Sequence, residues 1–282
     1  MNPSSSRDTP LDQDSPLTQN HDLTDLTDMM RARTAESHRI SDLAINLRLA
    51  SAIRDRQKWG QSLAAFYVII ARVENLIERH KGHEMVARYA LLLPSVGCTA
   101  AFEADLSYYL GDGYREHLPR TPAIDSYLAH LDSLAERNPV LLLPFAYHLH
   151  MGILSGGVIL AKTARREMQL PPSRGTAFCE GPVLDPPSPR WILKKKMKDA
   201  MNSLAFESEL QREELLKQSV NCFLFNNRIV EELPFGARTV DVFRMLPLKL
   251  RACVLGAIVV TTAIAVKVAG NYLREGTVRS KK

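Results

Sequence analysis

Cysteine is scarce in this sequence, and its spacing fits no familiar cysteine framework. The 282 residues contain four cysteines, Cys98, Cys179, Cys222 and Cys253, with no C-x-x-C pair and no close histidine partner in the sequence. Disulfide scaffolds and zinc sites both show closely spaced cysteines, in zinc sites often together with histidines. The spacing therefore suggests neither a disulfide framework nor a zinc site. It fits a domain that faces a reducing compartment.

Signals for strands, internal repeats and a secretory leader are also missing. Residues 1–28 carry six aspartates against Arg7, and they are rich in Ser, Thr, Pro and Asn. They lack the basic start and apolar core of a signal peptide, and their acidity argues against a mitochondrial presequence. Because this segment has few large apolar residues to bury, we predict that it is disordered. Because it lacks both kinds of targeting signal, we predict that the domain begins in the cytosol.

Basic charge is concentrated at one end of the chain. The formal net charge is +5, but from Lys249 to the end there are seven basic residues against Glu275 alone. Nucleic-acid-binding domains usually combine a basic face with interleaved aromatic residues. No such pattern accompanies the charge here, so the sequence predicts no nucleic-acid partner.

Helical periodicity is abundant. Apolar residues recur at helical spacing along most of the chain between turn residues, and no strand pattern rises above this background. The chain is also long enough to bury one main core. We predict an all-α fold, with a proline-rich loop at 171–190. The expected helices cover residues 29–53, 59–80, 84–92, 98–110, 121–136, 138–170, 191–204 and 207–233.

The segment Tyr147–Gly157 places three glycines inside one predicted helix. A glycine in a helix costs roughly 1 kcal/mol relative to alanine, so Gly152, Gly156 and Gly157 suggest that something lies close to the backbone. At about 100° per residue, Gly152 and Gly156 share one face. Phe145, Leu149 and Ile159 fall on that face too. Two interpretations stay open: tight helix packing or a kink, and a bare platform for a large flat ligand.

The first predicted helix is apolar on two nearly opposite faces, as expected for a helix held between two apolar bodies. His38 lies on one of these faces together with Ile45 and Leu49. Asp42 follows one turn later on the same side. A carboxylate there can accept the ring N–H of a histidine whose other nitrogen binds a metal. The alternative is a His/Asp pair on a polar surface.

Two further features could contact a ligand. Lys194 and Lys198 are one turn apart within a basic cluster, a spacing that suits two carboxylates of a single ligand. The alternative is a solvated charged face. The last predicted helix carries Phe223 and Phe225 near its middle.

The C-terminus predicts a membrane anchor. Residues 252–266 carry no charge, and apolar character resumes after Lys267. A bilayer core requires about 20 apolar residues, a length reached if Lys267 snorkels to an interface. The alternative is a buried helix of the domain. We therefore expect a helical domain at 29–235, a linker at 236–247, a transmembrane tail anchor at 248–273 and a basic tail at 274–282.

Five sequence blocks give the chain a specific resemblance. They read Ser-His-Arg-Ile-Ser-Asp at 37–42, Val-Glu-Asn-Leu-Ile-Glu-Arg-His-Lys at 73–81, Glu-Ala-Asp-Leu-Ser-Tyr-Tyr-Leu-Gly at 103–111, Leu-Ser-Gly-Gly at 154–157 and Met-Asn-Ser-Leu at 201–204. In order and spacing these blocks resemble the heme oxygenases, over roughly residues 31–233. The resemblance implies a helical bundle that holds heme b between a proximal helix and a kinked, Gly-rich distal helix.

The resemblance also implies roles for individual residues. His38 corresponds to the iron ligand, Asp42 to the carboxylate that orients it, and Gly152 and Gly156 to the distal-helix backbone over the heme. The positions that contact the heme propionates or the ring correspond to Arg31, Tyr147, Lys194, Lys198 and Phe223. His148, one turn before Gly152, could approach the iron and give a six-coordinate resting state; the alternative is a packed or surface histidine.

The implied activity opens heme, as both substrate and prosthetic group, to biliverdin, CO and Fe2+ with electrons from NADPH through a reductase of the cytochrome P450 type. The implied location is the endoplasmic reticulum membrane, facing the cytosol, with the outer mitochondrial membrane as the alternative.

Several positions depart from the family pattern. The family's distal helix reads Gly-Asp-Leu-Ser-Gly-Gly, and its Asp organises the water network that delivers protons during oxygenation; this chain has Ile153 there. A distal Arg is replaced by Leu149 and a distal Tyr by Ile70, and Lys198 stands where the family often has Arg, without bidentate geometry. The sequence thus leaves two functions open, an active heme oxygenase and a non-catalytic heme-binding sensor or buffer.

Overall fold

A computed structural model describes residues 25–172, 174–180 and 188–233; within it, the side chains of residues 39–51 are not described. The predicted linker at 236–247, tail anchor at 248–273 and basic tail at 274–282 lie outside these ranges, as does nearly all of the predicted disordered segment at 1–28. Throughout the described ranges the chain is helical and contains no strand, so the predicted all-α class is confirmed.

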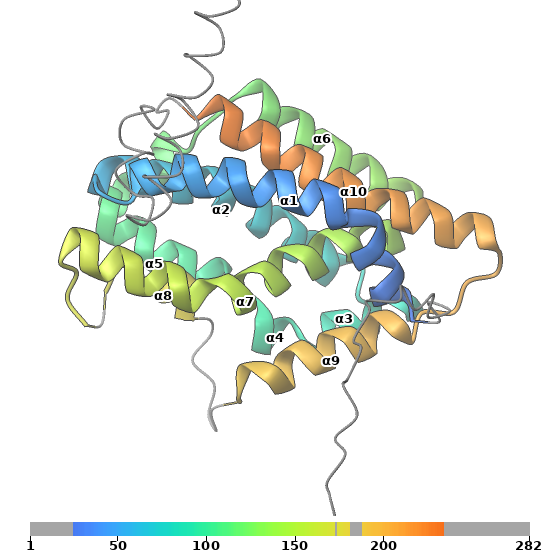
Figure 1. The fold of residues 1–282 in the computed structure, drawn as a ribbon. Coiled ribbons are helices and arrows are strands. Elements are labelled where there is room, and N and C mark those ends of the chain that lie inside the picture. Colours follow the sequence, from blue (N-terminus) through green and yellow to red (C-terminus); the bar gives the residue numbers. More distant parts are fainter. Residues whose placement is uncertain (1–24, 173, 181–187, 234–282) are drawn as a thin grey trace, which may run out of the picture.

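Ten α-helices and two short 3-10 helices (η) follow one another in the described part of the chain (Figure 1). The predicted helices reappear with shifts of a few residues at their ends. The bounds are α1 Leu26–Ala52, α2 Arg56–Arg79, α3 Glu84–Ala90, α4 Leu93–Val96, α5 Thr99–Leu110, η1 Asp112–His117, α6 Pro122–Arg137, η2 Pro139–Leu142, α7 Leu143–Met168, α8 Ala177–Glu180, α9 Arg190–Asn202 and α10 Glu209–Glu232.

Side-chain caps fix where three of the longer helices begin. Asp55 accepts hydrogen bonds from the backbone N–H groups of Gln57 and Lys58 at the start of α2. The N–H of Lys58 is the main reason that the pKa of Asp55 lies below its usual value. Thr121 caps α6 and Ser208 caps α10 in the same manner. Each cap satisfies backbone donors that lack a partner within the helix.

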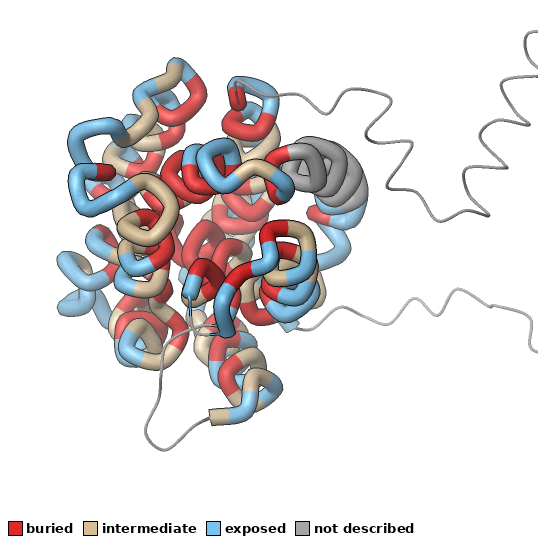
Figure 2. Tube along the Cα trace, turned by 90° about the vertical axis from the view of Figure 1, so that its left-hand side faces the viewer, coloured by how far each residue is buried: buried red, intermediate tan, exposed pale blue. Residues whose placement is uncertain are grey.

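Helix α2 lies at the centre of the bundle. It packs against α5, α6, α7 and α1, while α1 and α10 run side by side along one edge (Figure 1). Buried residues concentrate on the inward sides of the helices and exposed ones on the outside (Figure 2). Large aromatic and aliphatic side chains fill the interior. The bulkiest fully buried ones are Trp59, Tyr89, Tyr127, Phe102 and Phe145.

The loop after α7 is fixed to the bundle by a buried carboxylate. Asp105, on α5, accepts hydrogen bonds from the N–H groups of Ala177 and Phe178 at 3.1 and 3.0 Å. Burial raises the pKa of Asp105 to about 6, although these two N–H groups oppose the shift. The contact holds Phe178 against the ring of Phe102, with centroids 4.6 Å apart. Asp105 belongs to the block 103–111 that carries the family resemblance, and the structure gives this residue a structural role.

Two described stretches are long and apolar enough to cross a membrane, namely Glu84–Leu110 and Pro139–Met168. Core helices of soluble proteins meet the same criterion, and both stretches contribute residues to the core. The evidence for a membrane span among the described residues is therefore weak.

Candidate functional site

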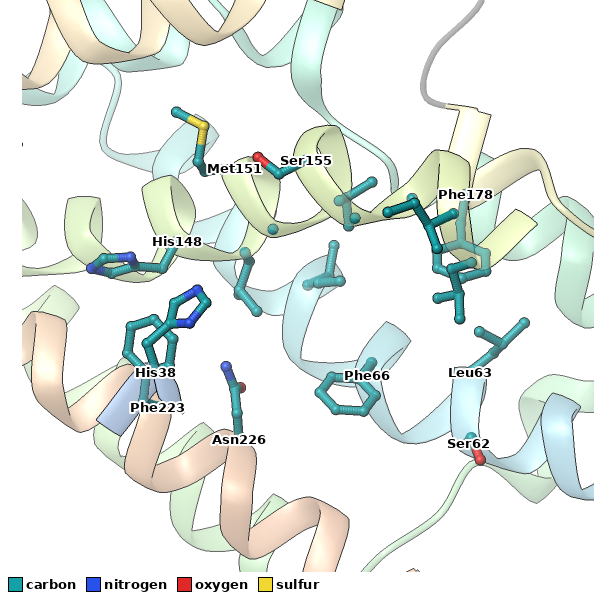
Figure 3. A pocket seen from close by; sticks show the side chains of 18 of the residues that line it. His38, Ser62, Leu63, Phe66, His148, Met151, Ser155, Phe178, Phe223 and Asn226 are labelled. Carbon is teal, nitrogen blue, oxygen red and sulfur yellow. The ribbon is translucent and has the colours of Figure 1, made fainter. Parts of the chain in front are cut away.

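A large pocket opens between α1, α2, α7 and α10, with a cavity volume of about 1100 Å³ (Figure 3). Ligand sites of this kind are concave and mostly apolar, with a few convergent polar groups. Most of the lining here is apolar, including Leu63, Phe66, Ile70, Leu149, Ile153, Phe178 and Phe223. Polar groups enter mainly from α1 and α7, so the pocket has an apolar body with polar groups at particular places.

The sequence left two interpretations of the α7 glycines open, close helix packing and a bare platform for a ligand. The structure supports each of them at different glycines. A Cβ added at Gly152 or Gly156 would have no described atom within 4 Å outside its own helix turn, and both residues line the pocket. A Cβ at Gly157 would lie 2.6 Å from the carbonyl oxygen of Cys179. Gly157 therefore serves close packing, whereas Gly152 and Gly156 present bare backbone to the pocket.

The apolar residues predicted to share the face of Gly152 and Gly156 do not all reach the pocket. Leu149 and Ile159 line the pocket with the glycines. Phe145 is not part of the described lining; it is fully buried on the other side, against the rings of Tyr127 and His130. Helical spacing alone placed Phe145 on the face of Gly152 and Gly156 that could hold a ligand. This detail is wrong, because rings of α6 pack against Phe145.

We expect the three glycines to respond oppositely to alanine. Gly152→Ala and Gly156→Ala should raise the free energy of unfolding of the heme-free protein by up to about 1 kcal/mol each, since alanine favours the helix. Both should weaken heme binding, because the new methyl group occupies the pocket. Gly157→Ala should lower stability by about 1–3 kcal/mol through overpacking against Cys179. Thermal unfolding and heme titration of the full chain check this; a Gly157→Ala protein as stable as the other two would contradict it.

The wall opposite the glycines carries His38. This residue lies on α1, is exposed, and lines the pocket; its ring centroid is 5.4 Å from that of Phe223 on α10. Asp42, predicted to orient His38, falls among the residues whose side chains are not described, and its role stays a prediction. The structure thus places His38 and the bare backbone of Gly152 and Gly156 around one pocket.

Positive charge gathers at the pocket margin. Arg31 and Lys198, together with Tyr147, belong to the lining, and all three were predicted to meet carboxylates. The Arg31 side chain is 82% exposed and lies 3.8 Å from Asp28. Burial raises the pKa of Tyr147 to about 12, helped by the charge of Asp28, so its hydroxyl remains a hydrogen-bond donor at neutral pH. Lys194 is not among the described lining residues, although it lies one turn from Lys198 on α9.

Three of the positions that depart from the family pattern are apolar, and all three line the pocket. Ile70 and Leu149 are buried, at 3% and 9% exposure, and Ile153 is half-buried. None of the three side chains can hold a water molecule by hydrogen bonding. At these three positions, the pocket wall is therefore hydrocarbon.

His148 and Asn226 bring unpaired polar atoms to the same pocket. For the Nε2 atom of His148 and the Oδ1 atom of Asn226, no described group lies within hydrogen-bond distance, and both atoms are buried. Burial, together with the charge of His38, lowers the pKa of His148 to about 3. His148 is therefore a neutral imidazole at physiological pH. The sequence predicted the position of His148 on the helix but could not predict that its Nε2 atom is buried.

Beneath the distal helix, the structure joins residues that the sequence does not connect. Glu74 of α2, Cys98 before α5 and His150 of α7 bring one ligand-type atom each to within 4.8 Å of the others. His150 Nε2 lies 2.9 Å from a Glu74 oxygen, and its Nδ1 lies 3.1 Å from the hydroxyl of Tyr89. The N–H groups of Cys98 and Thr99 also donate to Glu74, at 2.8 and 3.2 Å.

This cluster ties three helices together. Burial alone would raise the pKa of Glu74, but the hydrogen bond and charge of His150 bring the pKa below its usual value. Within the cluster, each of the described polar side chains has a hydrogen-bond partner. We assign the cluster a structural role: it fixes α7 just before Gly152 and so positions the distal wall.

The chain is similar to known proteins over most of its length. The family model described as heme oxygenase matches residues 24–232. Heme oxygenase 1 of Rattus norvegicus is 30% identical over 212 residues, covering 74% of this chain and 71% of its own length. Heme oxygenase 2 of Synechocystis sp. is 27% identical over 212 residues, covering 75% of this chain and 84% of its own length.

Two solved structures share the arrangement of helices. Heme oxygenase 2 from Chlamydomonas reinhardtii without heme matches with a TM-score of 0.69 and 27% identity, over 76% of this chain and all of that one. Heme oxygenase-2 from Synechocystis sp. in complex with heme and NO matches with a TM-score of 0.66 and 27% identity, over 74% of this chain and 85% of that one.

Proposed function

The chain belongs to the heme oxygenase family, and from this premise we propose that it cleaves heme to biliverdin, CO and Fe2+. The reaction consumes O2 and electrons that NADPH supplies through a reductase of the cytochrome P450 type. One observation carries the proposal: a histidine, His38, and a stretch of side-chain-free backbone at Gly152 and Gly156 line the same pocket. A flat macrocycle needs a ligand for its metal and clearance for its faces, and this pocket offers both.

The residues present fit heme b. His38 would supply the imidazole for the iron, and Phe223 would pack beside it. Arg31, Lys198 and the Tyr147 hydroxyl would take the two propionates at the margin, with Lys194 one turn from Lys198 as a further cation. Charge-assisted hydrogen bonds of this kind are stronger than neutral ones. The apolar body of the pocket would exclude bulk water from the ring.

The bound heme supplies an iron centre for oxygen chemistry and is itself the molecule that is opened. The protein contributes position and protons. Gly152 and Gly156 leave room over one face, and their neighbouring backbone groups can hold water by hydrogen bonding. Because Ile153, Leu149 and Ile70 offer no polar atom, backbone groups and the few polar side chains of the pocket must carry any proton delivery.

A non-catalytic heme binder is the second candidate, and the same three apolar residues favour it. General acid catalysis requires a donor within roughly 2.6–3.2 Å of the reacting atom or one water away. Where the family has Asp, this pocket has Ile153. A protein that holds heme without opening it would use the same pocket, His38 and basic margin, and would act as a sensor or buffer.

Turnover of the full chain separates the two candidates. The protein in detergent is loaded with one equivalent of heme, then given NADPH and a cytochrome P450 reductase, and biliverdin absorption is followed. Biliverdin formation that stops when the reductase is omitted supports the enzyme. Stable one-to-one heme binding without biliverdin supports the binder, and failure to bind heme would reject both.

We further propose that residues 248–273 anchor the chain in a membrane by its tail, with the helical domain in the cytosol. The supporting feature is the apolar segment near the C-terminus, flanked by basic residues on both sides. The endoplasmic reticulum is the proposed membrane, and the outer mitochondrial membrane is the alternative.

Protease treatment of intact membranes tests this topology. The helical domain should be digested without detergent, because it faces outward, while a short C-terminal fragment stays protected. A tag fused to each end identifies the fragments. Full protection of the helical domain would contradict the proposed orientation. Subcellular fractionation, followed with marker proteins for each membrane, would distinguish the endoplasmic reticulum from the outer mitochondrial membrane.

A further inference from the structure

We infer that His148 is a second iron ligand, so that heme in this pocket is held between the imidazoles of His38 and His148. This inference rests on the proposed binding of heme, and it concerns the resting state of the loaded protein. The argument has three steps: the unmet bonding capacity of His148, its position relative to His38, and the contrast with His150 on the same helix.

The first step is the buried Nε2 atom of His148. A buried nitrogen without a hydrogen-bond partner costs about 1–3 kcal/mol in stability. Among the described residues no group satisfies this atom, and His148 lines the pocket. A neutral imidazole nitrogen with a free lone pair is the form that binds metals.

The second step is geometry. His38 on α1 and His148 on α7 contact the same aromatic ring, Phe223, with ring centroids 5.4 and 5.0 Å from it. Figure 3 shows both imidazoles gathered over Phe223 at one end of the pocket. The two histidines come from the two helices between which the family holds heme. An iron atom placed between α1 and α7 thus has one imidazole on each wall.

The third step is the comparison of His148 with His150, two residues later on α7. Both ring nitrogens of His150 are engaged, one by Glu74 and one by Tyr89. His150 therefore acts as a structural histidine turned away from the ligand. His148 has no such partners among the described residues, and it lines the pocket that His150 does not. Of the two histidines on this turn of α7, only His148 is placed to meet a ligand.

Spectroscopy of the full chain loaded with ferric heme tests the inference without requiring turnover. Two axial imidazoles give a low-spin, six-coordinate spectrum by absorption and electron paramagnetic resonance. We expect this spectrum in the wild type and a high-spin spectrum in His148→Leu. Leucine fits an apolar setting and removes the unpaired nitrogen, so the heme-free His148→Leu protein should unfold at the same or a higher temperature. Exposed His117 lies outside the described lining, and His117→Leu should leave the spectrum unchanged.

Added imidazole provides a second readout. In His148→Leu it has little room to bind, whereas in His148→Ala it should restore the low-spin spectrum by filling the space of the lost ring. A wild type that binds one heme but is high-spin, or a low-spin spectrum that persists in both His148 variants, would overturn the inference while leaving the proposed function intact. A wild type that binds no heme would reject the proposed function itself.

Discussion

Replacing His38 with alanine is expected to lower heme affinity at least about 100-fold. Loss of a residue that merely supports a metal ligand costs about 10–100-fold in metal affinity, and His38 is proposed as the ligand itself. The pocket would still enclose the ring, and Arg31 and Lys198 would still meet the propionates. Some heme should therefore bind, with an altered Soret band.

The measurement is a heme titration of the full chain, followed by absorption and by quenching of intrinsic fluorescence. His117→Ala serves as the control, since it removes an exposed histidine away from the described pocket lining. If His148 is the second ligand, His38→Ala keeps one imidazole on the iron, and the double variant His38→Ala/His148→Leu loses both. An unchanged affinity and spectrum in His38→Ala would refute the assignment of His38.

Local features of the fold could be predicted from the sequence because they depend on neighbours along the chain. Helix periodicity gave the helices to within a few residues. The same periodicity placed Gly152 and Gly156 on one face, and the structure shows that face toward the pocket. These predictions succeed because the helix repeat fixes the angle between residues a few positions apart.

Features that depend on distant segments could not be predicted in this way. Gly157 packs against Cys179, which lies beyond the end of α7, so helical spacing placed Gly157 off the face of Gly156 but could not show what it packs against. The cluster of Glu74, Cys98 and His150 joins three helices, and cysteine spacing gave no sign of it. The role of each of these residues depends on how the helices pack together.

The basic pair on α9 shows the same limit. Lys194 and Lys198 are one turn apart and looked equivalent in the sequence, yet only Lys198 belongs to the described lining. The packing of α9 against α7 decides which lysine reaches the pocket. The burial of the His148 nitrogen has a similar origin, since Phe223 of α10 packs against its ring.

Replacing Ile153 with aspartate is expected to accelerate biliverdin formation by roughly 100-fold, the lower end of the range for a positioned acid or base. Ile153 is half-buried, lines the pocket and lies one residue after Gly152. A carboxylate there can order water where the wall is now hydrocarbon, beside Ile70 and Leu149. Ordered water would deliver protons that the wild-type pocket supplies slowly. We expect slow or leaky heme degradation by the wild type for the same reason.

Two control variants make this test specific. Ile153→Asn has nearly the same shape and hydrogen-bonding reach without an acid, so it should gain less. Ile159→Asp places the same charge at a pocket residue that is 71% exposed, and it should gain nothing. If His148 caps the iron, His148→Leu/Ile153→Asp should be faster than Ile153→Asp alone. The explanation fails if Ile153→Asp folds and binds heme but gains no rate. It fails equally if the wild type already forms biliverdin as fast as a family member that carries the aspartate. In that case the apolar wall would impose no limit on proton delivery.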